Sequence, residues 1–389
     1  MGNMILYAEA YRNMGFEWMP FNEVDSLILS QLSYYHYAKS EFGKTEFSST
    51  IAEFLMQYGE EAVHELMTIK NDQKLSEILK RGGRHGGLRA CGYVEILDAE
   101  FGDCGKQFAA ITFEIEKGIY YIAYRGTDNS VTGWKEDTNL SFSREIPAQK
   151  EAVLYAQKMM DQLEGRFYLG GHSKGGNMAI YTVMKLPEKY RQRIDAVYNH
   201  DGPGFFREVY ESEAYRAVRS MIYKSVPQSS LIGMIWEADD NYRVVKSSAE
   251  GFFQHDPYTW LVEDTDFVRV EAVDSFSMHI THVMNSWLEE IDFADRKRMI
   301  DAVFSVISAS GVSLFNEFSE QRRQKIKALL VGITDVESDD RKLVFSAVRR
   351  LFSISAGELQ EIIKEIGAAK IEKYRHILQK PEREEDKHE

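Results

Sequence analysis

Cysteine is scarce in this chain of 389 residues, which contains only Cys91 and Cys104. Two thiols in so long a chain do not indicate a disulfide scaffold, and they lack the spacing of a metal site. We therefore expect small, buried or partly buried thiols, and a reducing cytoplasm is the simplest setting for them.

Long apolar runs and a basic excess are also missing from the sequence. No run approaches the roughly 18 apolar residues that cross a bilayer, and the first residues do not read as a secretory signal. The formal net charge of -14 repels phosphate backbones, so nucleic acid is not an expected partner. The same sign disfavours purely electrostatic docking to an anionic membrane. These absences predict a soluble, cytoplasmic protein without a transmembrane segment.

The apolar patterning changes twice along the chain. A helical segment is expected over about 1–80, where residues 21–37 have helical spacing and Asn22 or Asp25 as a cap. From residue 107 onward β-type runs alternate with helical ones, beginning with a hairpin across "EKG". This alternation predicts an α/β domain over 1–290, with a mainly parallel sheet covered by helices on both faces.

The residues after the α/β domain have a different residue pattern. Amphipathic helical patterns fill residues 291–380, which predicts a helical C-terminal region, and the charged residues 381–389 are expected to be a disordered tail.

The stretch "KRGGRHGGLRACGY" (80–93) is glycine-rich and basic, as a phosphate-binding loop would be. It lacks the Lys-Ser/Thr ending of a P-loop, so we expect a mobile loop there.

The stretch "LGGHSKGGNMAIY" (169–181) places Ser173 between Gly171 and Gly175 in a G-x-S-x-G pattern. An apolar strand pattern precedes it and a helical pattern follows, which is the context of a nucleophile elbow. Small neighbours are needed because the turn strains the backbone at the serine. The helix N-terminus would favour a developing oxyanion, so the sequence predicts Ser173 as a nucleophile.

A serine nucleophile needs a histidine base, which in this fold follows it along the chain. His255 lies in the loop "EGFFQHDPYTW", after the last expected strand, and is the predicted base. His200 comes early for that role, although it ends a strand beside Asp201. His279 and His282 lie three residues apart on an expected helix and are interpreted as a surface pair rather than a metal pair.

The oxyanion needs two donors, one of which should be the backbone N–H of Lys174. The loop "YRGTDNSVTGWKED" offers the second near Gly126 and Thr127, whose hydroxyl could add a further hydrogen bond. The side chain of Lys174 is interpreted as either a solvated charge or a contact for an anionic substrate.

Three neighbouring features have supporting interpretations. Trp134 and Asp137 would brace the oxyanion loop, and the Asn177 amide could tie the elbow to an adjacent loop. The apolar stretch "LIGMIW" (231–236) could line an acyl pocket, act as a lid or pack in the core.

Five stretches occur in one order: "YRGTDNSVTGWKED", "GHSKGGNMAIY", "HDGPGF", "VPQSSLIGM" and "QHDPYTW". Together they closely resemble the Mbeg-like proteins, a bacterial α/β-hydrolase family usually described as a domain of unknown function. More distantly, the pattern is similar to the class 3 lipases. The resemblance covers about residues 1–290 and implies an α/β-hydrolase fold. It also implies Ser173 as nucleophile, His255 as base and Thr127 as an oxyanion contributor.

The orienting acid is where the sequence departs from the lipases it resembles. Class 3 lipases place the acid after the strand that here reads "SMIYKSVP", and the closest counterpart is Ser230. Asp201, after the preceding strand, is the predicted substitute, although a structural role in a Gly-Pro turn is the alternative. Asp239 and Asp240 are weaker candidates, and Asp256 is too near His255 in sequence.

Three functions compete at this point. The leading prediction is a serine hydrolase that cleaves a lipid or other acyl ester without a metal or organic cofactor, although thioesters and amides suit the same residues. The second is a non-catalytic binding or scaffold protein that uses the C-terminal helices for a protein partner. The third is a lipase in peripheral contact with a membrane surface, which would need an exposed apolar patch or a lid.

Overall fold

The computed structural model divides the chain into two compact units, Met1–Trp287 and Leu288–Glu389. The predicted helical region 291–380 and tail 381–389 lie outside the described residues, as do Cys104, Trp134 and Asp137. The structure describes residues 2–47, 49–63, 68–98, 106–127, 145–249, 251–275, 277–278, 281–282 and 285–286. All of these residues lie in the first unit.

An eight-stranded sheet runs through the first unit in the order β1-β2-β3-β4-β5-β6-β7-β10. Its strands are β1 (Arg89–Asp98), β2 (Lys106–Glu116), β3 (Ile119–Tyr124), β4 (Arg166–His172), β5 (Ile194–His200), β6 (Ile222–Pro227), β7 (Tyr242–Val245) and β10 (Arg269–Val270). Strands β3 to β7 are parallel, whereas β1 and β2, β2 and β3, and β7 and β10 pair antiparallel. The predicted mainly parallel sheet and its initial hairpin are confirmed. A separate two-stranded sheet joins β8 (Val262–Glu263) and β9 (Asp266–Phe267).

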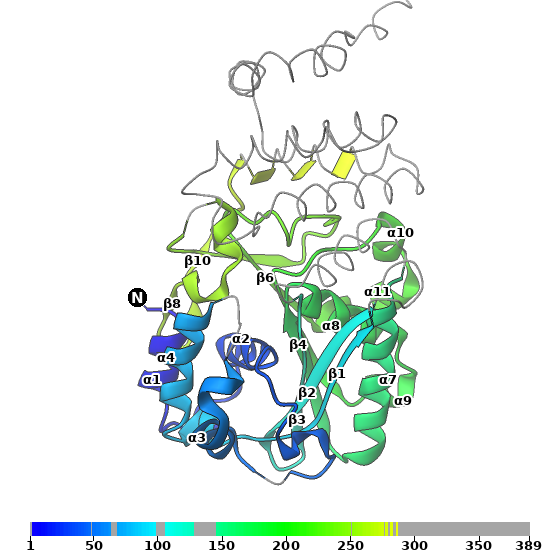
Figure 1. Cartoon of the computed structure of the whole chain (residues 1–389). Helices are drawn as coiled ribbons and strands as arrows, with labels where there is room; N and C mark the ends of the chain where they lie inside the picture. The colour runs from blue at the N-terminus through cyan, green and yellow to red at the C-terminus, as the bar shows by residue number, and fades with distance from the viewer. Residues whose placement is uncertain are drawn as a thin grey trace, which may run out of the picture. The chain divides into compact units, whose positions relative to one another are not determined.

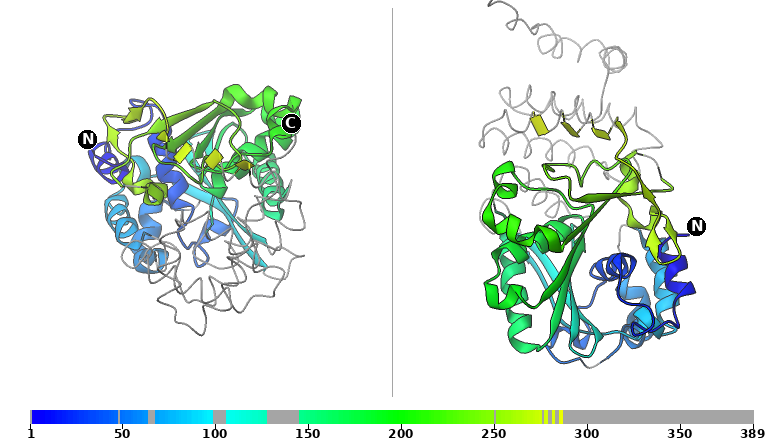
Figure 2. Two further views of the ribbon diagram at one scale, coloured as in Figure 1. Left: turned by 90° about the horizontal axis from the view of Figure 1, so that it is seen from above. Right: turned by 180° about the vertical axis from the view of Figure 1, so that it is seen from behind.

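Helices cover both faces of the large sheet (Figures 1 and 2). The N-terminal helices lie on one face: α1 (Met4–Ala10), α2 (Glu23–Leu32), α3 (Ile51–Ala62) and α4 (Ile69–Leu79). The later helices lie on the other: α7 (Pro147–Gln162), α8 (Lys174–Lys185), α9 (Glu188–Arg191) and α11 (Glu213–Val218). Helix α2 contacts β4 from the first side, whereas α8 contacts the same strand from the second.

The shorter helices connect these elements. They are α5 (Gly83–Gly86) and α10 (Arg207–Tyr210), together with the 3₁₀ turns η1 (Glu41–Gly43), η2 (Arg219–Met221), η3 (Gly251–His255) and η4 (Pro257–Thr259). None of the helices in the described ranges is long and apolar enough to cross a bilayer.

Strand alternation produces one apolar core on each face of the sheet. Along β3, Tyr121 and Ala123 join the core beneath the N-terminal helices, whereas Tyr120, Ile122 and Tyr124 join the core beneath α7 and α8. Successive side chains of a strand point to opposite faces, so a sheet covered on both sides needs apolar residues at every position. The near-continuous apolar runs of the sequence meet that requirement.

Helix α2 begins with the predicted N-cap, Asn22. The Asn22 side chain accepts hydrogen bonds from the backbone N–H groups of Val24 and Asp25, and the Asp25 carboxylate accepts from the Asn22 N–H. This reciprocal pair satisfies N–H groups that have no acceptor within the helix.

The prediction of a mobile loop over residues 80–93 is wrong. The segment forms α5 and the start of β1, and the Arg84 guanidinium is buried against the Asp25 carboxylate, with Nε–Oδ1 and Nη2–Oδ2 distances of 2.8 and 2.5 Å. His85 Nε2 lies 2.8 Å from the same carboxylate. A buried charge requires such partners, so Arg84 and His85 bind this segment to α2.

Candidate active site

Ser173 occupies a strained turn between β4 and α8. Its φ of 58° and ψ of -132° lie in a region that non-glycine residues rarely adopt. The turn is tight, since a methyl group on Gly175 would lie 2.1 Å from the carbonyl oxygen of Tyr124. The predicted strand–turn–helix around Ser173 is therefore present, and it holds the serine at the carboxyl end of a central strand.

The structure brings Ser173, His255 and Asp201 together, although they come from three separate segments. His255 ends η3, and its Nε2 lies 3.1 Å from Ser173 Oγ. Its Nδ1 lies 2.7 Å from Asp201 Oδ2. With Nδ1–H donating to the carboxylate, Nε2 is left to accept the serine proton, which is the tautomer that a general base requires.

Asp201 follows β5 directly and has a buried side chain and a φ of 53°. Its second carboxylate oxygen, Oδ1, accepts a hydrogen bond of 2.5 Å from the hydroxyl of Ser230. Ser230 stands where the resemblance to the class 3 lipases leads one to expect the acid. That position therefore supplies a donor to the carboxylate instead of the carboxylate itself.

The other candidate acids have different partners. Asp239 pairs with Arg219, and although burial opposes it, hydrogen bonds from Arg219 and Tyr215 lower the pKa of Asp239 to about 2. The exposed Asp240 also pairs with Arg219. The Asp256 carboxylate accepts from the backbone N–H of Tyr258 and caps η4. Asp201 is the one of these four whose carboxylate meets the His255 ring at hydrogen-bond distance.

His172 is a site residue that the sequence reasoning missed. Its Nε2 lies 2.9 Å from the backbone oxygen of His255, and its Nδ1 lies 3.3 Å from the Tyr34 hydroxyl. Burial, and then the neighbouring charge of His255, hold the pKa of His172 well below its usual value. The signal was available as a polar ring directly before Ser173, after the largely apolar stretch "FYLGG" of the same strand.

The predicted oxyanion residues lie around Ser173. A methyl group on Gly126 would lie 3.2 Å from Ser173 Cβ, and the neighbouring Thr127 is buried. Within the described residues, Thr127 Oγ1 has no hydrogen-bond partner. Lys174 is the first residue of α8, where backbone N–H groups have no acceptor inside the helix.

The Lys174 side chain is not a solvated charge, so that interpretation is wrong. It is 1 % exposed, and its Nζ lies 3.2 Å from both the backbone oxygen and the side-chain Oε1 of Gln107 on β2. The lysine thus reaches from the start of α8 to β2, a contact that a sequence pattern cannot reveal. The backbone N–H of Lys174 remains the predicted oxyanion donor.

The remaining histidines have other surroundings. His200 is buried with Nε2 2.8 Å from Ser26 Oγ, and burial, followed by the charge of Arg269, lowers the pKa of His200 to about 3. His282 is exposed, and His279 lies outside the described residues. No group of three His, Cys, Asp or Glu side chains that could hold a metal occurs in the described part of the chain.

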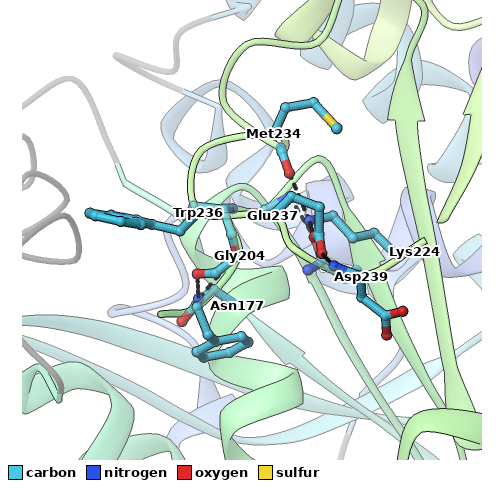
Figure 3. A network of polar contacts seen from close by, with 12 residues as sticks. Asn177, Gly204, Lys224, Met234, Trp236, Glu237 and Asp239 are labelled. Atoms are coloured by element: carbon cyan, nitrogen blue, oxygen red, sulfur yellow. Dashed lines mark hydrogen bonds and ion pairs between the residues drawn. The ribbon is translucent and has the colours of Figure 1, made fainter. Parts of the chain in front are cut away.

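Two further interpretations can be placed. The Asn177 amide donates to the carbonyl oxygens of Pro203 and Gly204, each at 3.1 Å, and so ties the elbow helix to the turn after β5 as predicted (Figure 3). In the stretch 231–236, Met234 packs with Val226 and Val244. Core packing is thus the role of Met234.

Cys91 is buried, as expected of the thiols, and burial raises its pKa to about 12.

Comparison with known proteins gives a family and a distant structural likeness. No curated protein sequence matches the chain. The crystal structure of M37 lipase is similar at 14% identity and a TM-score of 0.29, covering 56% of this chain and 70% of that chain. The parallel sheet, helices on both faces and strand–turn–helix elbow make this an α/β-hydrolase-like fold. A family model described as Mbeg1-like matches residues 79–305, and the chain therefore belongs to the Mbeg1-like family.

Proposed function

We propose that this protein is a serine hydrolase that cleaves an acyl ester through an acyl-enzyme. The observation that carries the proposal is the continuous hydrogen-bond chain from Ser173 Oγ through His255 to Asp201, with distances of 3.1 and 2.7 Å. A serine hydroxyl becomes a useful nucleophile when a histidine accepts its proton and an acid orients that histidine.

The first half of the reaction acylates the serine. His255 Nε2 takes the Ser173 proton as Oγ bonds to the ester carbonyl carbon, and the carbonyl π electrons move onto its oxygen. When the tetrahedral intermediate collapses, the bond to the leaving alcohol breaks, and the His255 imidazolium returns the proton to that alcohol. Asp201 stabilises the imidazolium while it exists.

The second half releases the acid. Water attacks the acyl carbon while His255 Nε2 takes its proton, and collapse of the second intermediate expels Ser173 Oγ, which regains a proton from His255. Atoms and charge balance with water as the co-reactant. The same residues suit thioesters and amides, so the acyl group, lipid or otherwise, defines the proposed substrate class.

The oxyanion of each intermediate would lie between Lys174 and Thr127. The Lys174 N–H stands at the N-terminal end of α8, where the helix dipole favours negative charge. A buried hydroxyl without a partner costs about 1–3 kcal/mol, and a substrate oxygen would satisfy Thr127 Oγ1.

We place this chemistry in the cytoplasm, because the chain has only two cysteines.

Hydrolysis of p-nitrophenyl esters from acetyl to dodecanoyl tests the proposal. The wild-type protein should release nitrophenol from at least one ester, and Ser173→Ala and His255→Gln should each abolish release. His282→Ala, which removes an exposed histidine away from the hydrogen-bond chain, is the matched control and should retain activity. Absence of turnover by folded wild-type protein, or turnover that survives Ser173→Ala, would favour the non-catalytic binding protein.

A further inference from the structure

The turn after β6 contacts the proposed catalytic acid, Asp201, and also Gln254, the residue before the proposed catalytic histidine. Ser230 Oγ donates to Asp201 Oδ1 at 2.5 Å. The preceding residue, Ser229, accepts a hydrogen bond from Gln254 Nε2 at 3.0 Å and donates its backbone N–H to Gln254 Oε1 at 2.8 Å. Gln254 directly precedes His255. One short turn therefore holds the acid through Ser230 and the base through Ser229.

The Ser230 hydroxyl has its direction fixed by its surroundings. Ser230 is 1 % exposed, and its Oγ accepts a hydrogen bond of 3.1 Å from the backbone N–H of Gly233. A hydroxyl has one proton to donate, and here the short contact to the Asp201 carboxylate takes it. Hydrogen bonds to a charged acceptor are the stronger ones, so this contact restrains the Asp201 carboxylate.

Gly233 lets the backbone approach the carboxylate. A methyl group at this position would lie 2.2 Å from Asp201 Oδ1, so a larger residue would displace the acid. The carbonyl oxygen of Gly233 accepts a hydrogen bond of 2.7 Å from Lys224 Nζ. Lys224, on β6, is also paired with Glu237, and both side chains are buried (Figure 3). This ion pair fixes the turn at its far side.

We infer that Ser230 is a positioning residue for the hydrolase reaction, which holds the Asp201 carboxylate in line with His255 and is itself anchored through Gly233 by the Lys224–Glu237 pair. The inference rests on the proposed function. It goes further because it assigns a role to the turn at residues 228–233, which the reaction steps do not use.

Loss of the hydroxyl should alter the histidine in a defined direction. A donor to a carboxylate stabilises its negative charge, and removing that donor leaves the charge more available to His255. The His255 imidazolium is then better stabilised, so His255 should keep its proton to a higher pH in Ser230→Ala than in the wild-type protein. His172, whose ring lies tilted against that of His255, and Asp256, the next residue, also act on His255, and neither changes in this variant.

Ser225→Ala provides a matched control. Ser225 is a fully buried serine on β6 whose hydroxyl donates to the Glu23 carboxylate at 2.9 Å and accepts from Arg269 at 3.1 Å. Each variant thus loses a buried hydroxyl with one donated and one accepted hydrogen bond. Only Ser230 contacts the carboxylate that meets His255.

Two readouts test the inference on the full chain. Relative to Ser225→Ala, Ser230→Ala should lose about tenfold in kcat on the best ester, with KM little changed, because the Asp201 carboxylate is no longer held in line with His255. Histidine ring NMR, with His255→Gln for assignment, should show the upward pKa shift. Equal kcat and equal His255 pKa in the two variants would overturn the inference.

A second variant and the NMR comparison distinguish failure of this inference from failure of the proposed function. If Ser230→Ala does not fold, Ser230→Cys keeps a donor at this position, although the thiol is slightly larger and donates more weakly. This variant should show a smaller shift in the same direction, and a wild-type kcat and pKa in it would also overturn the inference. If the wild-type protein cleaves no ester, the proposed function fails. The NMR comparison then still decides whether Ser230 controls the Asp201–His255 couple.

Discussion

His172 Nε2 lies 2.9 Å from the backbone carbonyl oxygen of His255, and the two ring centroids lie 4.6 Å apart with their planes tilted by 37°. A carbonyl only accepts, so Nε2 of His172 carries the hydrogen and Nδ1 accepts from the Tyr34 hydroxyl. Because its pKa is held well below the usual value by burial and by His255, His172 stays neutral when His255 is protonated. A neutral ring thus positions the proposed base without competing for its proton.

Replacing His172 by phenylalanine should lower kcat while the protein stays folded. Phenylalanine keeps a ring against His255 but removes the donor to its carbonyl oxygen, and a displacement of about 1 Å in a catalytic group can cost roughly 100-fold. His172→Gln restores an N–H donor and should recover part of the loss. Steady-state kinetics on one ester measure both, and an unchanged kcat in His172→Phe would show that the contact is dispensable.

Asp201→Asn should reduce kcat by about 10⁴, because the amide no longer stabilises the imidazolium and can hold His255 in the wrong tautomer. Asp239→Asn is the control, since Asp239 pairs with Arg219 and takes no part in the hydrogen-bond chain to Ser173. It should retain wild-type kcat. Comparable losses in the two variants would indicate general destabilisation, and urea unfolding of both proteins would reveal it.

Asp256 makes stability depend on pH in a defined direction. Burial, and then the charge of Asp72, raise the pKa of Asp256 to about 6. A carboxyl whose folded pKa exceeds its unfolded value favours the native state at low pH, and this contribution is lost as pH rises from about 4 to about 6. Asp256→Asn keeps the oxygen that caps η4. When the pH is raised from 4 to 8, its free energy of unfolding should increase by about 2 kcal/mol relative to that of the wild-type protein. Urea unfolding at both pH values measures the gain, and a constant difference would contradict it.

The buried Asp25–Arg84 pair should control the stability of the N-terminal helices. Arg84→Met leaves the Asp25 carboxylate buried without its bidentate partner and should cost about 3–5 kcal/mol in the free energy of unfolding. Arg81→Met, which removes an exposed pair with Glu9, should cost at most about 1 kcal/mol. Equal costs in urea unfolding would show that the buried pair is not the source of stability.

The same pair predicts acid sensitivity. Burial alone would raise the pKa of Asp25, but hydrogen bonds from Arg84 and His85 outweigh burial and hold that pKa below its usual value. A depressed carboxyl pKa gives stability that is present above the unfolded pKa of about 4 and is lost as pH falls through the folded pKa. The free energy of unfolding of Asp25→Asn should therefore fall less than that of the wild-type protein when the pH drops below about 4. Urea unfolding of both proteins across that range can show the difference.

The elements that the sequence predicted correctly are those with a local signal. The apolar run, glycine spacing and helical pattern around Ser173 are consecutive in sequence, and the turn geometry follows from them. His255 and Asp201 were predicted from their order along the chain after Ser173, and Asp201 follows β5, whose carboxyl end lies beside that of β4.

The features that the sequence did not reveal depend on distant partners. Arg84 lies in a glycine-rich stretch that looks mobile, yet it pairs with Asp25 on a helix formed much earlier in the chain. Lys174 looks like a surface charge until Gln107 on β2 is seen beside it. Ser230 looks like a missing acid until its contact with Asp201 is known. Such pairings have no periodicity, so a single sequence cannot predict them.

The most direct test of the central claim is the reaction of the wild-type protein with a fluorophosphonate probe, with the adduct located by mass spectrometry. An activated serine beside an oxyanion site should be phosphonylated at Ser173, and the label should be absent from Ser173→Ala and strongly reduced in Asp201→Asn. Folded wild-type protein that takes up no label at Ser173, or labels equally well when Asp201 is replaced, would contradict the account of Ser173, His255 and Asp201 as one catalytic unit.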